Sequence, residues 1–168
     1  MELLTVNELM KRMNGWRLQS NRIVFTNGCF DILHEGHVSY LAEAKKLGNR
    51  LIVGLNTDAS VKRQEKGDDR PVNHEESRAK VLSALRAVDA VVLFDEDTPL
   101  NLITTLQPDV LVKGADYDAG ETDATERRYI VGANEVKKYG GAVMTIPLVK
   151  GVSTTNTIRK LKSVNGQG

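Results

Sequence analysis

The sequence alternates short, strongly apolar runs with longer segments of helical periodicity. The runs expected to form β-strands are 22–26, 50–55, 90–94, 109–113 and 142–147. Their nearly continuous apolar character is typical of strands buried on both faces of a parallel sheet. The segments expected to form helices are 37–47, 58–64, 74–88, 99–106, 124–139 and 155–162. This alternation predicts an α/β fold, a Rossmann-like, doubly wound parallel sheet of about five strands with right-handed crossovers.

The chain length of 168 residues suits one compact domain. Thr5 and Glu8 have the spacing of a capping box, which predicts an extra N-terminal helix outside the main sheet. We therefore divide the chain into a helical extension at 1–20, a single α/β domain at 21–163 and a tail at 164–168. The charge-rich segments 65–71 and 116–128 lack strand periodicity and are expected to be mobile loops at one rim of the sheet.

Charge and composition exclude several classes of protein. Lys and Arg number 23 against 22 Asp and Glu, and aromatic residues are only 5%, so the sequence offers neither a basic surface nor stacking residues for nucleic acid. No apolar run approaches the roughly 20 residues that span a bilayer, and the N-terminus lacks the features of a signal peptide. The single cysteine, Cys29, cannot form an internal disulfide. We expect a cytoplasmic protein with neither a nucleic-acid nor a membrane partner.

The most informative segment is 25–37, which joins the first predicted strand to the first crossover helix. Ligands of doubly wound sheets bind at this carboxyl end of the strands. Gly28 permits close backbone approach, Gly36 permits a tight turn, and the helix that begins near His37 directs free N–H groups toward the same space. Together these features predict an anion site.

His34 and His37 flank the turn, and both imidazoles can donate hydrogen bonds to phosphate oxygens. The structural alternative is that they cap a helix or bond to buried carbonyls. A zinc site is the other alternative, but no cysteine or third histidine lies nearby in sequence, so we expect no metal held by protein side chains. The segment also lacks the glycine fingerprint of dinucleotide-binding folds and a Walker A motif.

A second polar segment, 152–155, precedes the last helical pattern. Ser153 or Thr154 can cap that helix, and the same hydroxyls and free N–H groups can bind phosphate. Both interpretations are compatible with each other.

The H-x-G-H turn at 34–37 after the first strand resembles the signature of the cytidylyltransferase-like nucleotidyltransferase superfamily. The string 26–37, followed by 151–155, is similar to its bacterial heptose-1-phosphate adenylyltransferases, and the likeness runs from about 22 to 162. The resemblance implies transfer of AMP from ATP to D-glycero-β-D-manno-heptose 1-phosphate, giving ADP-heptose and pyrophosphate for lipopolysaccharide synthesis. It also implies Mg²⁺ carried by the substrate ATP.

The resemblance carries roles to individual residues. It implies catalytic roles for His34, His37, Lys62 and Arg78. It implies nucleotide and phosphate binding by Thr26, Asn27, Gly28, Cys29, Phe30, Gly36, Ser153, Thr154 and Thr155. It offers Asp31, Arg63, Lys113 and Asp116 as substrate-binding candidates.

The resemblance further implies a homodimer and a sugar kinase that supplies the acceptor. Because the chain has no room for a kinase domain, we expect that kinase to be a separate enzyme. Related cytidylyltransferases have an arginine where this chain has Leu148, which favours adenine over cytosine. The alternatives within enzymes are CTP with glycerol 3-phosphate, or ATP with FMN or phosphopantetheine. The alternative from another class is a nucleotide-sensing module without catalysis.

Overall fold

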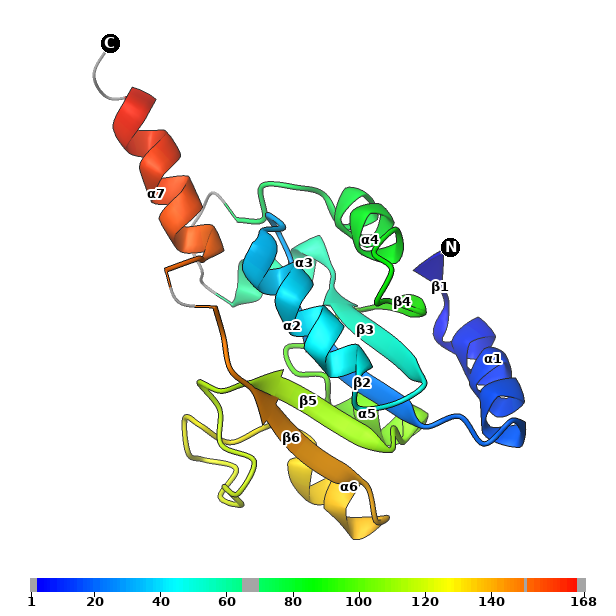
Figure 1. The fold of residues 1–168 in the computed structure, drawn as a ribbon. Helices are drawn as coiled ribbons and strands as arrows, with labels where there is room; N and C mark the ends of the chain where they lie inside the picture. The colour runs from blue at the N-terminus through cyan, green and yellow to red at the C-terminus, as the bar shows by residue number, and fades with distance from the viewer. Residues whose placement is uncertain (1–2, 65–69, 150, 166–168) are drawn as a thin grey trace.

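The computed structural model describes residues 3–64, 70–149 and 151–165. Its sheet has six strands in the order β1-β4-β3-β2-β5-β6, and every neighbouring pair is parallel (Figure 1). The strands are β1 (Leu3–Leu4), β2 (Ile23–Gly28), β3 (Arg50–Asn56), β4 (Ala90–Phe94), β5 (Val110–Gly114) and β6 (Ala142–Ile146). The helices are α1 (Val6–Leu18), α2 (Glu35–Lys45), α3 (Asp58–Arg63), α4 (Glu75–Ser83), α5 (Leu100–Leu106), α6 (Ala133–Lys138) and α7 (Thr154–Asn165). The predicted α/β class and parallel sheet are confirmed, with β1 as a strand beyond the expected five.

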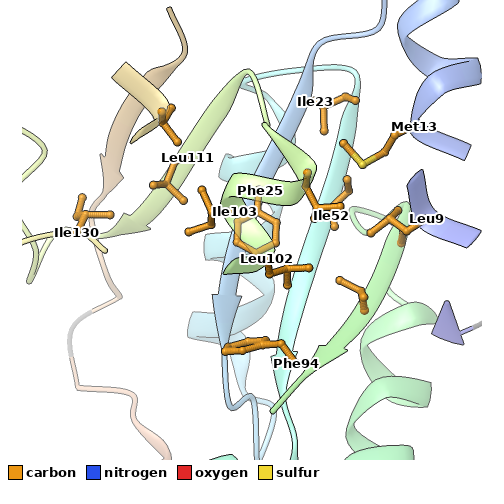
Figure 2. Packing of buried hydrophobic residues seen from close by; sticks show 14 of the residues in the cluster. Leu9, Met13, Ile23, Phe25, Ile52, Phe94, Leu102, Ile103, Leu111 and Ile130 are labelled. Carbon is orange, nitrogen blue, oxygen red and sulfur yellow. The ribbon is translucent and has the colours of Figure 1, made fainter. Parts of the chain in front are cut away.

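Alternate side chains of the central strands enter two separate cores. On β2, Ile23 and Phe25 join the cluster under α1, α5 and α6, whereas Val24 joins the cluster under α2 and α4. Figure 2 shows the first cluster, with the Phe25 ring beside Leu102 and Ile103 of α5. Since successive side chains of a strand point to opposite faces, a strand covered on both sides must be apolar throughout, as the sequence of β2 is.

Gly54 makes room for the largest side chain of the central core. A Cβ atom at this position of β3 would lie 2.7 Å from Cζ of Phe25 and 3.2 Å from Cδ2 of Leu102. A glycine in the middle of a strand ordinarily weakens it, and here it marks the close approach of a buried ring.

The N-terminal helix begins as predicted, because Thr5 and Glu8 form both hydrogen bonds of a capping box. Its apolar face is nevertheless part of the main core, where Leu9 and Met13 are fully buried. The two residues before it form β1, which pairs with β4 through Leu3 and Leu4. A two-residue strand is too short to show periodicity, so β1 was not predictable from the sequence.

The predicted helix at 124–139 is wrong in its first half, since α6 begins only at Ala133. Asp123 instead accepts hydrogen bonds from the backbone N–H and hydroxyl of Thr125, and Gly132 takes a φ of 87° immediately before α6. Aspartate side chains that bond to nearby backbone N–H groups favour turns over helix. The segment 115–132 is therefore a long irregular connection, as the charge pattern of 116–128 indicates.

The last helix, α7, projects from one corner of the sheet (Figure 1). It begins one residue earlier and ends three residues later than predicted. Residues 65–69 of the expected loop 65–71 and residues 166–168 of the expected tail lie outside the described residues. Within the described part of the chain, no helix is long and apolar enough to cross a membrane.

Candidate functional site

A cavity of about 580 Å³ opens at the carboxyl ends of the parallel strands. It lies over the ends of β2, β3 and β5 and is bordered by the start of α2 and the start of α7. Eleven of the predicted residues line it: Asn27, Gly28, Cys29, Phe30, His34, Gly36, His37, Lys113, Asp116, Ser153 and Thr154. These predicted site residues thus meet at a cavity on the carboxyl edge of the sheet.

His34 and His37 stack against each other on the cavity wall. Their ring centroids are 3.9 Å apart with an interplanar angle of 18°. His34 is the N-cap of α2, yet its side chain makes no capping hydrogen bond, so its imidazole does not serve the helix. Gly36 lies between them, and a Cβ atom there would come within 3.0 Å of Nδ1 of His34. A side chain at position 36 would therefore displace the His34 ring.

Both imidazoles have a buried Nδ1 with no hydrogen-bond partner among the described residues. Buried polar atoms are ordinarily paired, so two unpaired ring nitrogens side by side are unusual. Burial lowers the pKa of His37 to about 4, with a smaller contribution from His34 and an opposing one from the carbonyl of Ile32. His37 is therefore neutral at pH 7 until an anion arrives to favour its protonated form.

Phe30 packs against both His37 and Gly28. Its ring meets His37 edge to face at 5.2 Å between centroids, and it lies so close to Gly28 that a Cβ atom there would be 3.1 Å from Cε2 of Phe30. Phe30 takes a φ of 44°, in the left-handed region that a non-glycine residue rarely adopts. Such strain persists where the surroundings determine the conformation, and it is common at functional sites.

The start of α7 joins the same cavity from a distant part of the sequence. Ser153 Oγ accepts a hydrogen bond of 3.1 Å from the N–H of Asn156, so it caps the helix as predicted. The Thr154 hydroxyl donates to the carbonyl of Ile32 at 3.3 Å, which ties α7 to the histidine turn. Both residues line the cavity, whereas Thr155 is exposed and does not.

At the end of β5, Lys113 and Asp116 reach the cavity beside Tyr117. The Lys113 ammonium donates to the carbonyl of Asn27 at 3.2 Å and lies 5.5 Å from the centre of the Tyr117 ring. Burial raises the pKa of Tyr117, and the Asp116 charge adds to the rise. This wall thus combines an aromatic ring, a cation and a carboxylate.

Arg78 and Asp31 do not line the cavity, although both were predicted as site residues. Arg78 is buried and donates to the carbonyls of Cys29 at 2.6 Å and Asn73 at 2.9 Å and to the Asp58 carboxylate at 2.7 Å. Asp31 is buried and accepts from the N–H groups of 72 and 73, both at 2.9 Å, and it pairs with Arg70 at 2.8 Å. These two residues fix the loop after β2 from behind the cavity.

Thr26, Lys62 and Arg63 also lie outside the cavity lining. Thr26 is fully buried and bonds to the Tyr40 hydroxyl at 2.7 Å, which links β2 to α2. Lys62 is exposed on α3. Arg63 is exposed and forms ion pairs with Asp95 and Asp97 of the β4–α5 loop.

Four polar residues and two tyrosines of the cavity were not predicted from the sequence: Asn56, Gln64, Asp97, Thr98, Tyr40 and Tyr117. Tyr40 lies on α2, Asn56 ends β3, Gln64 follows α3, and the other three lie in the loops after β4 and β5. None belongs to a recognisable pattern. The position of each predicted strand end was the available signal, because the carboxyl ends of parallel strands share one edge of the sheet.

No group of three or more His, Cys, Asp or Glu side chains comes together within the described residues in a way that could hold a metal ion.

Comparison with known proteins shows the family to which the chain belongs. The profile described as cytidylyltransferase-like matches residues 25–160, which include the histidine turn, both cavity walls and the start of α7. The chain belongs to the cytidylyltransferase-like family. The family resemblance that the H-x-G-H turn indicates is thereby confirmed, and the match extends over most of the chain.

Curated relatives within this family match almost the whole chain. It is 52% identical over 162 residues to the bifunctional protein HldE of Methylobacillus flagellatus, and 52% identical over 161 residues to that of Gluconobacter oxydans. These alignments cover 96% of this chain but only 31% and 32% of the relatives. The chain thus spans about a third of the length of the curated relatives it matches.

Two solved structures share the architecture. The lipopolysaccharide core biosynthesis protein from Thermoplasma volcanium is 30% identical with a TM-score of 0.59, over 79% of this chain and 99% of its own. Pantothenate synthetase from Thermus thermophilus gives a TM-score of 0.61 at 16% identity, over 94% of this chain and 67% of its own, and so shows the fold alone. The first structure therefore supports both the family and the fold.

Proposed function

We propose that the chain transfers AMP from ATP to D-glycero-β-D-manno-heptose 1-phosphate and releases ADP-heptose and pyrophosphate. The observation that carries this proposal is the stacked pair His34 and His37, with unpaired buried Nδ1 atoms, in one cavity with Ser153 and Thr154. Two imidazole donors beside a helix N-terminus suit the polyphosphate of a nucleotide better than any uncharged ligand.

The reaction requires no nucleophile from the protein. An oxygen of the acceptor phosphate, already ionised, attacks the α-phosphorus of ATP, and the bond from that phosphorus to the bridging α–β oxygen breaks. The electron pair leaves with pyrophosphate, and no proton needs to be removed from the acceptor. Catalysis then consists of in-line positioning and stabilisation of developing charge, which preorganised donors supply.

The described residues suggest a role for each part of the cavity. His34 and His37 would donate to the α-phosphate region, and the pyrophosphate charge would raise the protonated fraction of His37. Ser153, Thr154 and the N-terminus of α7 would hold the departing pyrophosphate. Arg78 would act behind the site as a positioning residue, since its guanidinium bonds to the carbonyl of Cys29.

Mg²⁺ enters this proposal as part of the substrate. It is carried by the phosphates of ATP, because the cavity has no cluster of acidic ligands within the described residues. Magnesium commonly keeps several waters and is bound mainly through substrate phosphates.

Adenine preference is supported by the apolar wall near β5. Leu148 lines the cavity beside Gly114, where a leucine offers no hydrogen bond to the polar edge of cytosine. The choice of heptose phosphate as acceptor is supported by the likeness to the HldE proteins and to the lipopolysaccharide core biosynthesis protein. We propose that a sugar kinase supplies this acceptor in the cytoplasm and that the enzyme works as a homodimer.

The test is a panel of ATP and CTP with heptose 1-phosphate, glycerol 3-phosphate, FMN and phosphopantetheine, with pyrophosphate release as the readout. We expect turnover with ATP and heptose 1-phosphate and at least about tenfold less with every other pair, since a polar site rejects acceptors that leave its groups unpaired. Turnover only with another acceptor would overturn the heptose assignment. ATP binding without pyrophosphate release from any pair would instead identify a nucleotide-sensing module.

A further inference from the structure

The cavity extends to both sides of the central strand β2. Because β2 lies between β3 and β5 in the sheet, the histidine turn that follows it divides the cavity into two flanks. One flank is formed by residues that follow β5 and β6, and the other by residues that follow β3 and β4. A transfer between two substrates needs two such compartments that meet at the reacting phosphorus.

The flank beside β5 is largely apolar and aromatic. It presents Tyr117, Val131, Leu148 and Val149, with Lys113 as its cation and Asp116 as its carboxylate. An aromatic ring with aliphatic neighbours suits a flat nucleobase, and a carboxylate suits the hydroxyls of a ribose. We assign the nucleoside to this flank, with its polyphosphate directed at the histidine turn and at Ser153.

The flank beside β3 and β4 presents amide, carboxylate and hydroxyl groups. They come from Asn56, Gln64, Asp97 and Thr98. The Cys29 thiol donates to Oε1 of Gln64 at 3.5 Å, and the amide nitrogen of Gln64 makes no hydrogen bond to another described residue. The Thr98 hydroxyl makes no hydrogen bond to any other described residue. These groups face the same cavity and can bond to a polyhydroxylated ligand.

The β4–α5 loop that carries Asp97 and Thr98 is held in place by α3. Thr57 donates to the Asp95 carboxylate, and the Ser60 hydroxyl donates to the carbonyl of Glu96 at 3.0 Å. Arg63 donates from Nε to Asp97 at 2.7 Å. Thr57, Ser60 and Arg63, which make these contacts, are spaced three residues apart along α3. The loop is therefore held in place before any ligand binds. Pre-organised polar groups lose little entropy on binding and discriminate well.

We infer that Gln64 and Thr98, with the outer oxygen of Asp97, form the acceptor subsite and recognise the hydroxyls of the sugar phosphate. The inference rests on the proposed function, because it assigns the second substrate of that reaction. Nucleoside and pyrophosphate take the β5 flank and the start of α7, which leaves the β3–β4 flank for the acceptor. A site built to bond to hydroxyls rejects an acceptor that lacks them, because its own polar groups would then stay unpaired.

The experiment compares Gln64→Met and Thr98→Val with the wild-type protein in steady-state assays of pyrophosphate release. Each variant removes polar groups while keeping a similar shape. We expect the KM for heptose 1-phosphate to rise about three- to tenfold in each, in line with the loss of one neutral hydrogen bond. The KM for ATP should stay within about twofold, since both residues lie away from the nucleoside flank.

Two further variants serve as controls. Thr104→Val removes a hydroxyl on α5 that bonds only to backbone carbonyls, and it should leave both KM values unchanged. Tyr117→Leu alters the opposite flank and should raise the KM for ATP selectively. A selective rise in the KM for ATP in Gln64→Met and Thr98→Val, or no change in either KM, would overturn the acceptor subsite.

A binding measurement separates this inference from the proposed function. Heptose 1-phosphate is titrated calorimetrically into each protein in the presence of a non-hydrolysable ATP analogue. If the wild-type protein releases no pyrophosphate, the proposed transfer fails while the subsite is still judged by binding. Weaker binding to Gln64→Met and Thr98→Val supports the subsite, and equal binding to all proteins, including its complete absence, contradicts it.

Discussion

His37 is kept neutral by its surroundings, and this determines how the free site responds to pH. Burial and the adjacent His34 lower its pKa to about 4, below the ordinary value of 6.5. An unfolded chain therefore takes up a proton at this residue between pH 6.5 and 4, whereas the folded chain does not. The stabilising contribution is present above pH 6.5 and is lost as the pH falls toward 4.

We expect the wild-type protein to lose more stability on acidification than the variant His37→Asn. Between about pH 7.5 and about pH 5 the difference should be on the order of 1 kcal/mol, discounted because the imidazole is partly exposed. Urea denaturation of both proteins at the two pH values measures it, since all other titrating groups are shared. Equal losses in the two proteins would show that His37 titrates normally.

The sequence predicts that the basic side chain of Arg78 is important, but it does not predict where that side chain lies. Its guanidinium contacts two carbonyls and one carboxylate behind the motif loop rather than the cavity. The sequence shows a basic side chain on a predicted helix, but it does not show which side of the loop that helix approaches.

Substitution Arg78→Met should lower the free energy of unfolding by about 2–4 kcal/mol, because Asp58 and the carbonyl of Cys29 lose a buried partner. Arg86→Met is the matched control on the exposed surface, and it should change stability by less than about 0.5 kcal/mol. Chemical denaturation of both variants provides the comparison. A fully stable Arg78→Met would contradict the structural role of these contacts.

At the scale of elements, the strands were predictable and the irregular connections were not. The apolar runs predict β2, β3, β4, β5 and β6 to within about two residues at either end, since burial on both faces leaves an unambiguous pattern. The segment 115–132 was partly mistaken for helix, because the turn at Asp123 depends on side-chain hydrogen bonds that periodicity does not register. Tyr117 and Thr98 reach the cavity from such connections, which is why the site prediction omitted them.

Replacing a glycine within a strand or helix by alanine can lower or raise the stability of the protein. Gly54 and Gly15 allow both effects to be tested. Gly54→Ala on β3 should destabilise the protein by about 1–3 kcal/mol, since the new Cβ would lie 2.7 Å from the Phe25 ring. Gly15→Ala on α1 should stabilise it by about 0.5–1 kcal/mol, because no atom lies within 4 Å of the new Cβ and alanine favours helix. Thermal or urea unfolding of the two variants decides between these signs. Stability gained by Gly54→Ala would contradict the packing of Phe25.

At the scale of the whole molecule, the sheet brings together segments more than about 100 residues apart in the chain. The histidine turn and the start of α7 meet at one cavity because β2 is central and the chain returns beside it after β6. Motif residues on both sides of that contact were predictable from the sequence, since each lies at the start of a helix. The division of the cavity into an apolar and a polar flank was not, because it depends on the order of the strands in the sheet.

The central claim is that an oxygen of the acceptor phosphate attacks the α-phosphorus of ATP at the paired histidines. The most direct measurement uses heptose 1-phosphate labelled with ¹⁸O in its phosphate, with mass spectrometry of both products. We expect the label to stay in ADP-heptose and pyrophosphate to be unlabelled. We also expect His34→Ala and His37→Ala each to slow this transfer by at least about a hundredfold. Label in pyrophosphate, or wild-type rates in both variants, would contradict it.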